Sequence, residues 1–142
     1  MSRRVVVTGI GAVTPLGLGA RASYDRWLAG ESGIEDGVGR CDDFEPSDFQ
    51  SKKEIRRTDR FTQLTMGAAK EALEQVGFED DDDPPVDMER VGCIIATGIG
   101  GIITLQENCD LLRDKGAKAV SALAVPMLMP NAAAGNLALR YG

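Results

Sequence analysis

The residue types that could do chemistry gather first in a basic segment, residues 51–60, which reads SKKEIRRTDR. Its five cationic side chains stand against two carboxylates, so its net charge is +3 and the other residues carry −9 of the chain's total of −6. A cationic island on an acidic protein suits the electrostatic steering of an acidic partner. A solvated helix start with local ion pairs explains the same composition equally well. The residues alone leave both interpretations open.

Two glycine-rich stretches follow apolar runs, GIGAVT at residues 9–14 and GIGGII at residues 98–103. A dinucleotide-binding turn needs a third glycine at the sixth position of such a stretch, where Thr14 and Ile103 stand here. The spacing therefore favours tight structural turns over nucleotide binding, and no cofactor is expected. On these residues alone, Ile99 is expected to be a core-facing side chain of a turn.

Histidine is absent from all 142 residues. The commonest general base near neutral pH is therefore missing, which excludes a self-contained Ser-His or Cys-His catalyst. The three cysteines are widely spaced, so neither a disulfide framework nor a zinc site is expected, and Cys93 and Cys109 are predicted to be small core residues. The acidic run Asp80–Asp83 lacks the EF-hand pattern, which favours a solvated loop over a metal site.

The elements that must position these residues alternate between strands and helices. Residues 4–8 and 91–97 are apolar runs without polar alternation, typical of buried strands in a largely parallel sheet. Periodic apolar positions and terminal glycines predict helices over residues 22–29, 59–76, 102–115 and 131–141, with Thr58 or Asp59 capping the second. Residues 37–50 are expected to form a loop. This pattern indicates a single α/β domain whose sheet is short of strands.

The chain is 43% hydrophobic and 27% charged, and no apolar run approaches the length of a membrane span. A soluble protein is therefore expected, without membrane or nucleic-acid partners. The first residues also lack a signal-peptide cleavage pattern, which favours a cytoplasmic location.

Five stretches together resemble the beta-ketoacyl-acyl carrier protein synthases, particularly the 3-oxoacyl-ACP synthase II type. In chain order they are RRVVVTGIGAVTPLG, LAGESGI, SKKEIRRTDRFTQ, IATGIGG and VPMLMPNAAAGNLALRYG. The resemblance implies a thiolase-like layered fold, of which residues 1–142 would form part of the first half. It also implies decarboxylative condensation of acyl groups with malonyl-ACP in fatty-acid synthesis, without a metal or other cofactor, by an enzyme that is a homodimer when full length.

The same resemblance assigns roles to two groups of residues. Ile99, flanked by Gly98 and Gly100, matches a position that gates the acyl pocket. Lys53, Arg56 and Arg57 match positions that dock acyl carrier protein, and they would share one face if residues 51–57 were helical.

No catalytic residue is expected within the chain. In the family, the stretch resembling MPNAAAGNLALRYG precedes the strand that carries the nucleophilic cysteine, and two histidines and a lysine follow far later. Isolated residues 1–142 are therefore expected to be inactive. Two alternatives stay open: a polyketide ketosynthase or its non-catalytic chain-length partner, which a cysteine or its replacement after Gly142 would tell apart, and a carrier-protein-binding module without catalysis.

Overall fold

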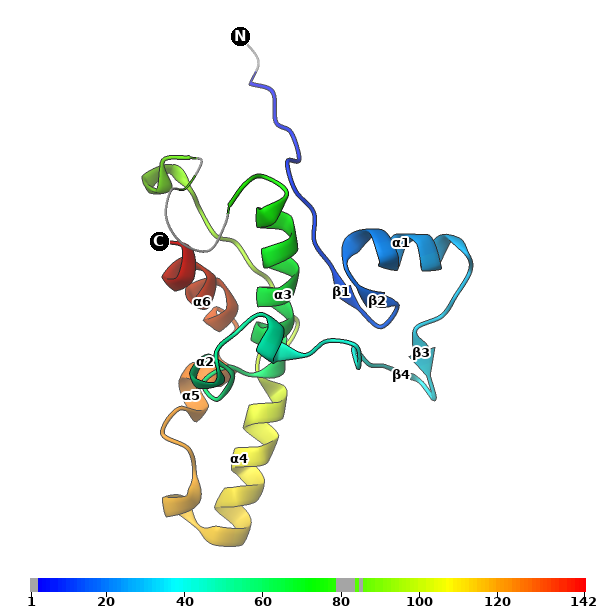
Figure 1. Ribbon diagram of the computed structural model, residues 1–142. Coiled ribbons are helices and arrows are strands. Elements are labelled where there is room, and N and C mark those ends of the chain that lie inside the picture. Colours follow the sequence, from blue (N-terminus) through cyan, green and yellow to red (C-terminus); the bar gives the residue numbers. More distant parts are fainter. Residues whose placement is uncertain (1–2, 79–83, 85) are drawn as a thin grey trace. The chain divides into compact units, whose positions relative to one another are not determined.

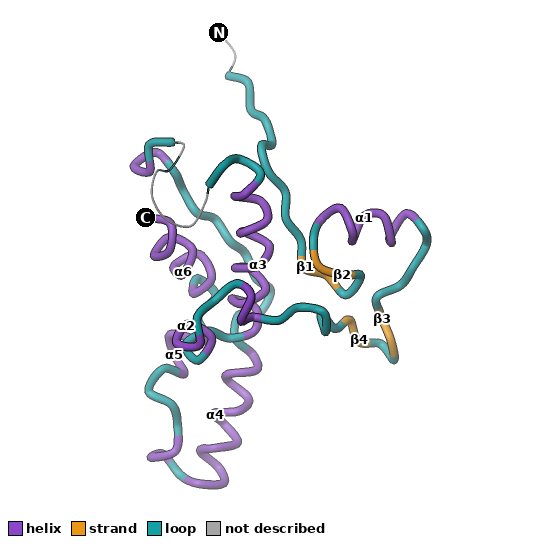
Figure 2. The backbone as a smooth tube through the Cα atoms, viewed as in Figure 1, coloured by secondary structure: helices purple, strands orange, loops and turns teal. Residues whose placement is uncertain are grey.

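A computed structural model of the chain describes residues 3–78, 84 and 86–142. It divides into two compact units, with residues 1–45 and 67–91 in unit 1 and residues 46–66 and 92–142 in unit 2. Helix α3 (Arg60–Glu74) runs from unit 2 into unit 1 (Figure 1). Helices predominate in the described part, as the purple segments of Figure 2 show, and its only strands form two short antiparallel pairs in unit 1.

The first strand pair of unit 1 joins β1 (Val13–Thr14) to β2 (Gly17–Leu18) and leads into helix α1 (Ala20–Leu28). Val13 pairs with Leu18 and Thr14 with Gly17 across the turn at Pro15 and Leu16. The Thr14 hydroxyl accepts a hydrogen bond from the Leu16 backbone N–H at 3.1 Å and lies 2.8 Å from the Ser23 hydroxyl of α1. These bonds attach the hairpin to the helix that follows it.

The extended segment before β1 lies against the unit 1 part of α3. A Cβ on Gly9 or Gly11 would lie 2.0 Å or 1.9 Å from the carbonyl oxygens of Ala72 or Ala68, so only glycine permits this approach. The Gln75 side-chain amide donates to the Ile10 carbonyl at 2.6 Å and accepts from the Ile10 N–H at 3.1 Å. A side chain thus supplies the two hydrogen bonds that a neighbouring strand would otherwise supply.

Glu71 of α3 completes this attachment. Its carboxylate accepts hydrogen bonds from the backbone N–H groups of Ala12 and Ala20, both at 2.8 Å. Ala20 is the first residue of α1, whose N-cap position is Gly19 and has no side-chain cap of its own. A carboxylate at this place is also favoured by the positive end of the helix dipole.

The second strand pair, β3 (Ile34–Glu35) with β4 (Val38–Gly39), occupies part of the region predicted to be a loop. Asp36 and Gly37 join the strands with φ values of 50° and 77°. Positive φ at both central residues defines a type I′ turn, for which Asp-Gly is a preferred pair. The loop prediction for residues 37–50 is therefore wrong at its start, and the 3-10 turn η1 (Pro46–Asp48) also falls within it.

Unit 2 is helical in its described secondary structure. It contains α2 (Lys52–Ile55), the start of α3, α4 (Ile102–Lys115), the 3-10 turn η3 (Ala117–Ala119), α5 (Ala124–Leu128) and α6 (Ala132–Tyr141). Helix α4 packs against η3 and α5, and α5 packs against α6. Met66, Ala133 and Leu137 are among its most buried apolar side chains. The remaining 3-10 turn, η2 (Met88–Arg90), belongs to unit 1.

The two predicted buried strands, residues 4–8 and 91–97, are wrong for this structure. Neither segment forms a strand, and Val5 and Ile94 are 94% and 95% exposed. A strand is stabilised by hydrogen bonds to a neighbouring strand, and no described residue pairs with either segment in a sheet. The chain was also expected to turn at Gly9, Gly11 and Pro15. It stays extended at the two glycines and turns at Pro15, so this prediction is right only for the proline.

The predicted burial of two cysteines is wrong as well. Cys93 lies in the extended segment before Gly98, and Cys109 lies on α4, and both are exposed. Leu105 and Leu112, the apolar neighbours of Cys109 along α4, are exposed too, so this face of the helix has no cover within the chain described. Over the same residues, no helix combines the length and the apolar character that crossing a membrane requires.

Candidate functional site

The basic segment folds as a single capped turn of helix. Helix α2 begins after Ser51, whose hydroxyl accepts from the Glu54 N–H at 3.3 Å while the Glu54 carboxylate accepts from the Ser51 N–H at 2.7 Å. This reciprocal capping box explains why so short a helix forms. The helix ends at Ile55. A shared face for Lys53, Arg56 and Arg57 was predicted on the condition that residues 51–57 are helical, and only part of that span is.

Glu54 is also paired with an arginine from the other end of unit 2. One guanidinium nitrogen of Arg140 on α6 lies 3.0 Å from Glu54 Oε1, and the other donates to the Phe49 carbonyl at 2.7 Å. Hydrogen bonding to Ser51 holds the pKa of Glu54 below its usual value, the positive charge of Arg140 acts in the same direction, and partial burial opposes both. Glu54 is therefore ionised at neutral pH and its charge is matched locally.

Replacing Glu54 by glutamine is expected to make the free energy of unfolding change less with pH in the acidic range. The folded-state pKa lies below the unfolded value of 4.5, so the carboxylate contributes stability above pH 4.5 and loses it as the pH falls through the folded value. Because the side chain is 40% exposed, solvent screening limits the effect at pH 7 to at most about 1 kcal/mol.

Urea denaturation at pH 7 and near pH 3 would measure this difference. Wild type should exceed Glu54→Gln in stability at pH 7 and match it at the acidic end. Glu107→Gln on the exposed surface of α4 is the control and should change neither value. If the difference in stability between wild type and Glu54→Gln persisted near pH 3, the stability would not come from the ionised Glu54 carboxylate.

Because Glu54 is paired with Arg140, cations dominate the exposed surface of the basic segment. Lys53, Arg56 and Arg57 are all exposed, and none of them forms an ion pair among the interactions of the described residues. Lys53 precedes Arg56 by three residues and Arg57 by four. The other carboxylate of the segment, Asp59, is only 5% exposed. The segment therefore presents positive charge that its own carboxylates do not neutralise.

The second glycine-rich stretch forms the expected tight turn. Gly100 has a φ of 80°, and a Cβ there would lie 2.6 Å from the Leu128 carbonyl oxygen, so the turn requires glycine. The Gly100 N–H donates to the Thr97 hydroxyl at 3.2 Å, and the Gly101 N–H donates to the Leu128 carbonyl at 3.0 Å. These contacts hold the C-terminal side of the turn against α5.

Ile99, at the apex of this turn, is 69% exposed. The expectation of a core-facing isoleucine is therefore wrong. A Cβ on Gly98 would meet nothing within 4 Å, in contrast to Gly100. The apex of the turn is therefore exposed, while its C-terminal side is held against α5.

Asp59 joins the basic segment to the first turn of α4, which directly follows the glycine-rich turn. Its backbone carbonyl accepts from the Gln63 N–H at 3.1 Å. Its carboxylate accepts from the Phe61 N–H at 3.4 Å, so Asp59 caps the start of α3 as the sequence predicted. Its carboxylate, in addition, accepts a buried hydrogen bond of 2.8 Å from the backbone N–H of Thr104 on α4. Sequence reasoning missed this second bond and the Arg140 pair, since the partners are 45 and 86 residues away and leave no local pattern.

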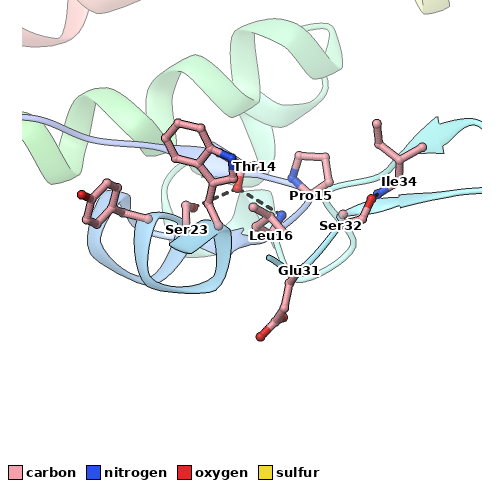
Figure 3. A pocket seen from close by; sticks show the side chains of 10 residues that line it. Thr14, Pro15, Leu16, Ser23, Glu31, Ser32 and Ile34 are labelled. Atoms are coloured by element: carbon pink, nitrogen blue, oxygen red, sulfur yellow. Dashed lines mark hydrogen bonds between the residues drawn. The ribbon is translucent and has the colours of Figure 1, made fainter. Parts of the chain in front are cut away.

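A pocket of about 580 Å³ in unit 1 contains none of the predicted site residues. It lies between β1, α1 and the segment leading to β3, and its lining includes Tyr24, Trp27 and Ile34 (Figure 3). The two aromatic rings meet edge to face with centroids 6.3 Å apart. The hydroxyl pair of Thr14 and Ser23 lies in its wall and is already hydrogen bonded.

Among residues 3–78 and 86–142, no three side chains that could bind a metal ion come together. The acidic run Asp80–Asp83, expected to be a solvated loop, lies outside the described residues. The first glycine-rich stretch is not a turn before a helix, so it lacks the geometry of a phosphate-binding loop.

Comparisons with known proteins identify the class to which this chain belongs. Residues 37–142 match the family described as "Beta-ketoacyl synthase, N-terminal domain". The chain is therefore a member of the beta-ketoacyl synthase family, as its motifs predicted.

Its relatives include proteins named 3-oxoacyl-[acyl-carrier-protein] synthase 2. The one from Staphylococcus aureus strain N315 is 36% identical over 99% of this chain, and the one from Coxiella burnetii is 34% identical over 98%. In both cases the matched region is 36% of the relative's length, so the chain spans about a third of these proteins.

Solved structures confirm the predicted thiolase-like fold class. One describes the ketosynthase AntDE with the type II polyketide acyl-carrier protein AntF and a bound hexaketide. It has a TM-score of 0.80 and 25% identity, and covers 99% of this chain and 39% of that one. The ishigamide ketosynthase/chain length factor has a TM-score of 0.75 at 19% identity, again over 99% of this chain, and 37% of its own.

Proposed function

We propose that this chain forms part of a 3-oxoacyl-acyl carrier protein synthase, an acyltransferase of fatty-acid synthesis. The observation that carries the proposal is the 36% identity to a protein of that name across nearly the whole chain. The exposed cations of residues 53–57 and the exposed apex of the turn at Ile99 are the features of this chain that suit the activity. In this proposal they dock the carrier protein and gate the acyl pocket.

In the proposed reaction, an enzyme cysteine takes the acyl group from its carrier thioester and releases the carrier thiol. Malonyl carrier protein then loses carbon dioxide, and the electron pair of the broken carbon–carbon bond attacks the enzyme thioester. The cysteine thiolate leaves, and the product is a 3-oxoacyl carrier protein longer by two carbons. The electron pair comes from the malonyl group itself, so the step needs no metal or redox cofactor. In this proposal the nucleophile lies outside residues 1–142.

The test is a condensation assay on the full-length gene product. Its substrates are a carrier protein that bears a saturated acyl group and a carrier protein that bears a malonyl group. A 3-oxoacyl product two carbons longer, detected by mass spectrometry together with carbon dioxide release, is expected. Absence of both, with the carrier proteins intact, would refute the proposal. Two further parts of it are a homodimer, which the family resemblance implies, and a cytoplasmic location, which the first residues favour. Sedimentation tests the first and cell fractionation the second.

A polyketide ketosynthase is the second candidate, because the structure of a ketosynthase with its type II polyketide acyl-carrier protein matches 99% of this chain at 25% identity. The two candidates differ in what they elongate. A fatty-acid enzyme should prefer saturated acyl chains, whereas a polyketide enzyme should accept chains that retain several keto groups. A chain-length partner without the cysteine would form no acyl-enzyme with either donor.

A further inference from the structure

Helix α4 begins without a side-chain cap of its own, because its N-cap residue is Gly101. A Cβ at this position would lie 2.6 Å from Leu128 Cα and 3.0 Å from Asp59 Oδ2, so no residue with a longer side chain fits. The first N–H groups of a helix have no acceptor within the helix. The side chain of the N-cap residue normally accepts a hydrogen bond from the N–H of the second or third helical residue.

Asp59 supplies that acceptor from 45 residues away. The residue that donates to it, Thr104, is the third residue of α4, and the 2.8 Å hydrogen bond is buried. Thr104 is itself 4% exposed, so water cannot take over the role of the carboxylate easily. A negative charge beside the first turn of a helix is also favoured by the helix dipole.

The backbone before Asp59, at the end of the basic segment, is held firmly by hydrogen bonds. Thr58 donates from its hydroxyl to the Glu54 carbonyl at 3.0 Å, and the Gln63 side-chain amide donates to the carbonyls of Ile55 and Thr58 at 3.3 and 3.1 Å. These bonds tie the end of α2 to the start of α3. Asp59 is the next residue, so its carboxylate is aimed by a well-bonded backbone.

We infer that Asp59 is a positioning residue, whose carboxylate holds the glycine turn and Ile99 in the arrangement that the reaction requires. This inference rests on the proposed function. The apex at residues 98–99 is exposed, and three attachments hold the turn: the bond from Gly100 to the Thr97 hydroxyl, the contacts of Gly100 and Gly101 with α5, and the bond from Asp59 to α4. Removing the carboxylate leaves the Thr104 N–H unpaired and loosens one of these attachments, and it also removes the longer, 3.4 Å bond to the Phe61 N–H at the start of α3.

The experiment compares Asp59→Ala, Asp59→Asn and Asp110→Ala in the full-length gene product. Asparagine keeps an oxygen acceptor and caps helices as well as aspartate does. The Asp110 side chain on α4 is half exposed and pairs with Arg113, so it is a matched control outside the turn. Hydrogen exchange of peptides covering residues 98–105 measures the turn, and thermal melting checks that each variant is folded.

Asp59→Ala is expected to speed exchange at residues 98–105 by about tenfold while residues 132–141 stay unchanged. Its kcat for long-chain acyl transfer should fall by about tenfold, with KM for acyl carrier protein within about twofold of wild type. Asp59→Asn should restore most of the activity, and Asp110→Ala should resemble wild type. Because Asp59 acts through Ile99, adding Ile99→Phe to Asp59→Ala should reduce kcat by less than the product of the two separate effects.

Several results would overturn the inference. Unchanged exchange at residues 98–105 in Asp59→Ala would show that the bond does not hold the turn. Faster exchange with an unchanged kcat, or fully multiplicative effects with Ile99→Phe, would show a structural role only. An Asp59→Asn variant as impaired as Asp59→Ala would show that the acceptor oxygen is not what matters. Wild-type protein that transfers no acyl group would instead contradict the proposed function.

Discussion

Reversing the charge of Lys53, Arg56 and Arg57 to glutamate is expected to slow association with acyl carrier protein by about 10- to 100-fold at low salt. An exposed charge pair contributes about 0.2 to 1 kcal/mol, so three together account for a change of this size. The cations are exposed, and the nearby carboxylates of Glu54 and Asp59 are engaged by Arg140 and Thr104. Stopped-flow association with the full-length gene product at several salt concentrations would measure both the rate and its salt dependence.

A control variant should carry the same change in net charge elsewhere. Arg4, Arg21 and Arg90 are exposed and lie in unit 1, so their replacement by glutamate serves this purpose. The control should lose no more than a few-fold in rate and keep the wild-type salt slope. Equal losses in both triple variants would mean that overall charge, and not the segment around α2, steers the partner.

Replacing Ile99 by phenylalanine is expected to slow acyl loading of long chains about tenfold more than that of short chains. The side chain is exposed at the apex of the turn, and in the proposed gate a larger group has to be displaced further before a long chain passes. Intact mass spectrometry of the acyl-enzyme, formed from carrier proteins with chains of different length, would give the loading rates.

Ile103→Phe is the matched control, because this isoleucine is also exposed but lies within the first turn of α4. It should affect all chain lengths alike and only slightly. If Ile99→Phe also slowed all chains equally, packing of the turn and not gating would explain its effect.

Local patterns in the sequence predicted the four longer helices well but missed the five-residue helix α5. The span 102–115 was predicted correctly because its apolar period ends at Gly116, whose φ of 78° suits only a glycine at a helix end. Helices α1, α3 and α6 were predicted to within about two residues at each end. The Asp36-Gly37 turn has an equally local signal and could have been found from it.

Features that depend on distant residues could not be predicted in this way. Val5 and Ile94 lie in runs with strong β propensity, but a strand forms only where a neighbour accepts and donates its hydrogen bonds. The bond from Asp59 to Thr104 and the pair of Arg140 with Glu54 depend on how helices meet in unit 2. Neither sequence periodicity nor motif spacing encodes such a meeting, although charge and glycine content did locate the basic segment and the turn.

The most direct test of carrier-protein docking compares two acyl donors that differ only in the carrier. The full-length gene product would be given a long-chain acyl carrier protein or the same acyl group on pantetheine, and acyl-enzyme formation would be followed by intact mass. Docking at residues 53–57 predicts that the wild type uses the carrier-bound donor at least about tenfold faster, and that the triple glutamate variant loses this preference while keeping its rate with acyl pantetheine. Equal rates with the two donors in the wild type would contradict the account.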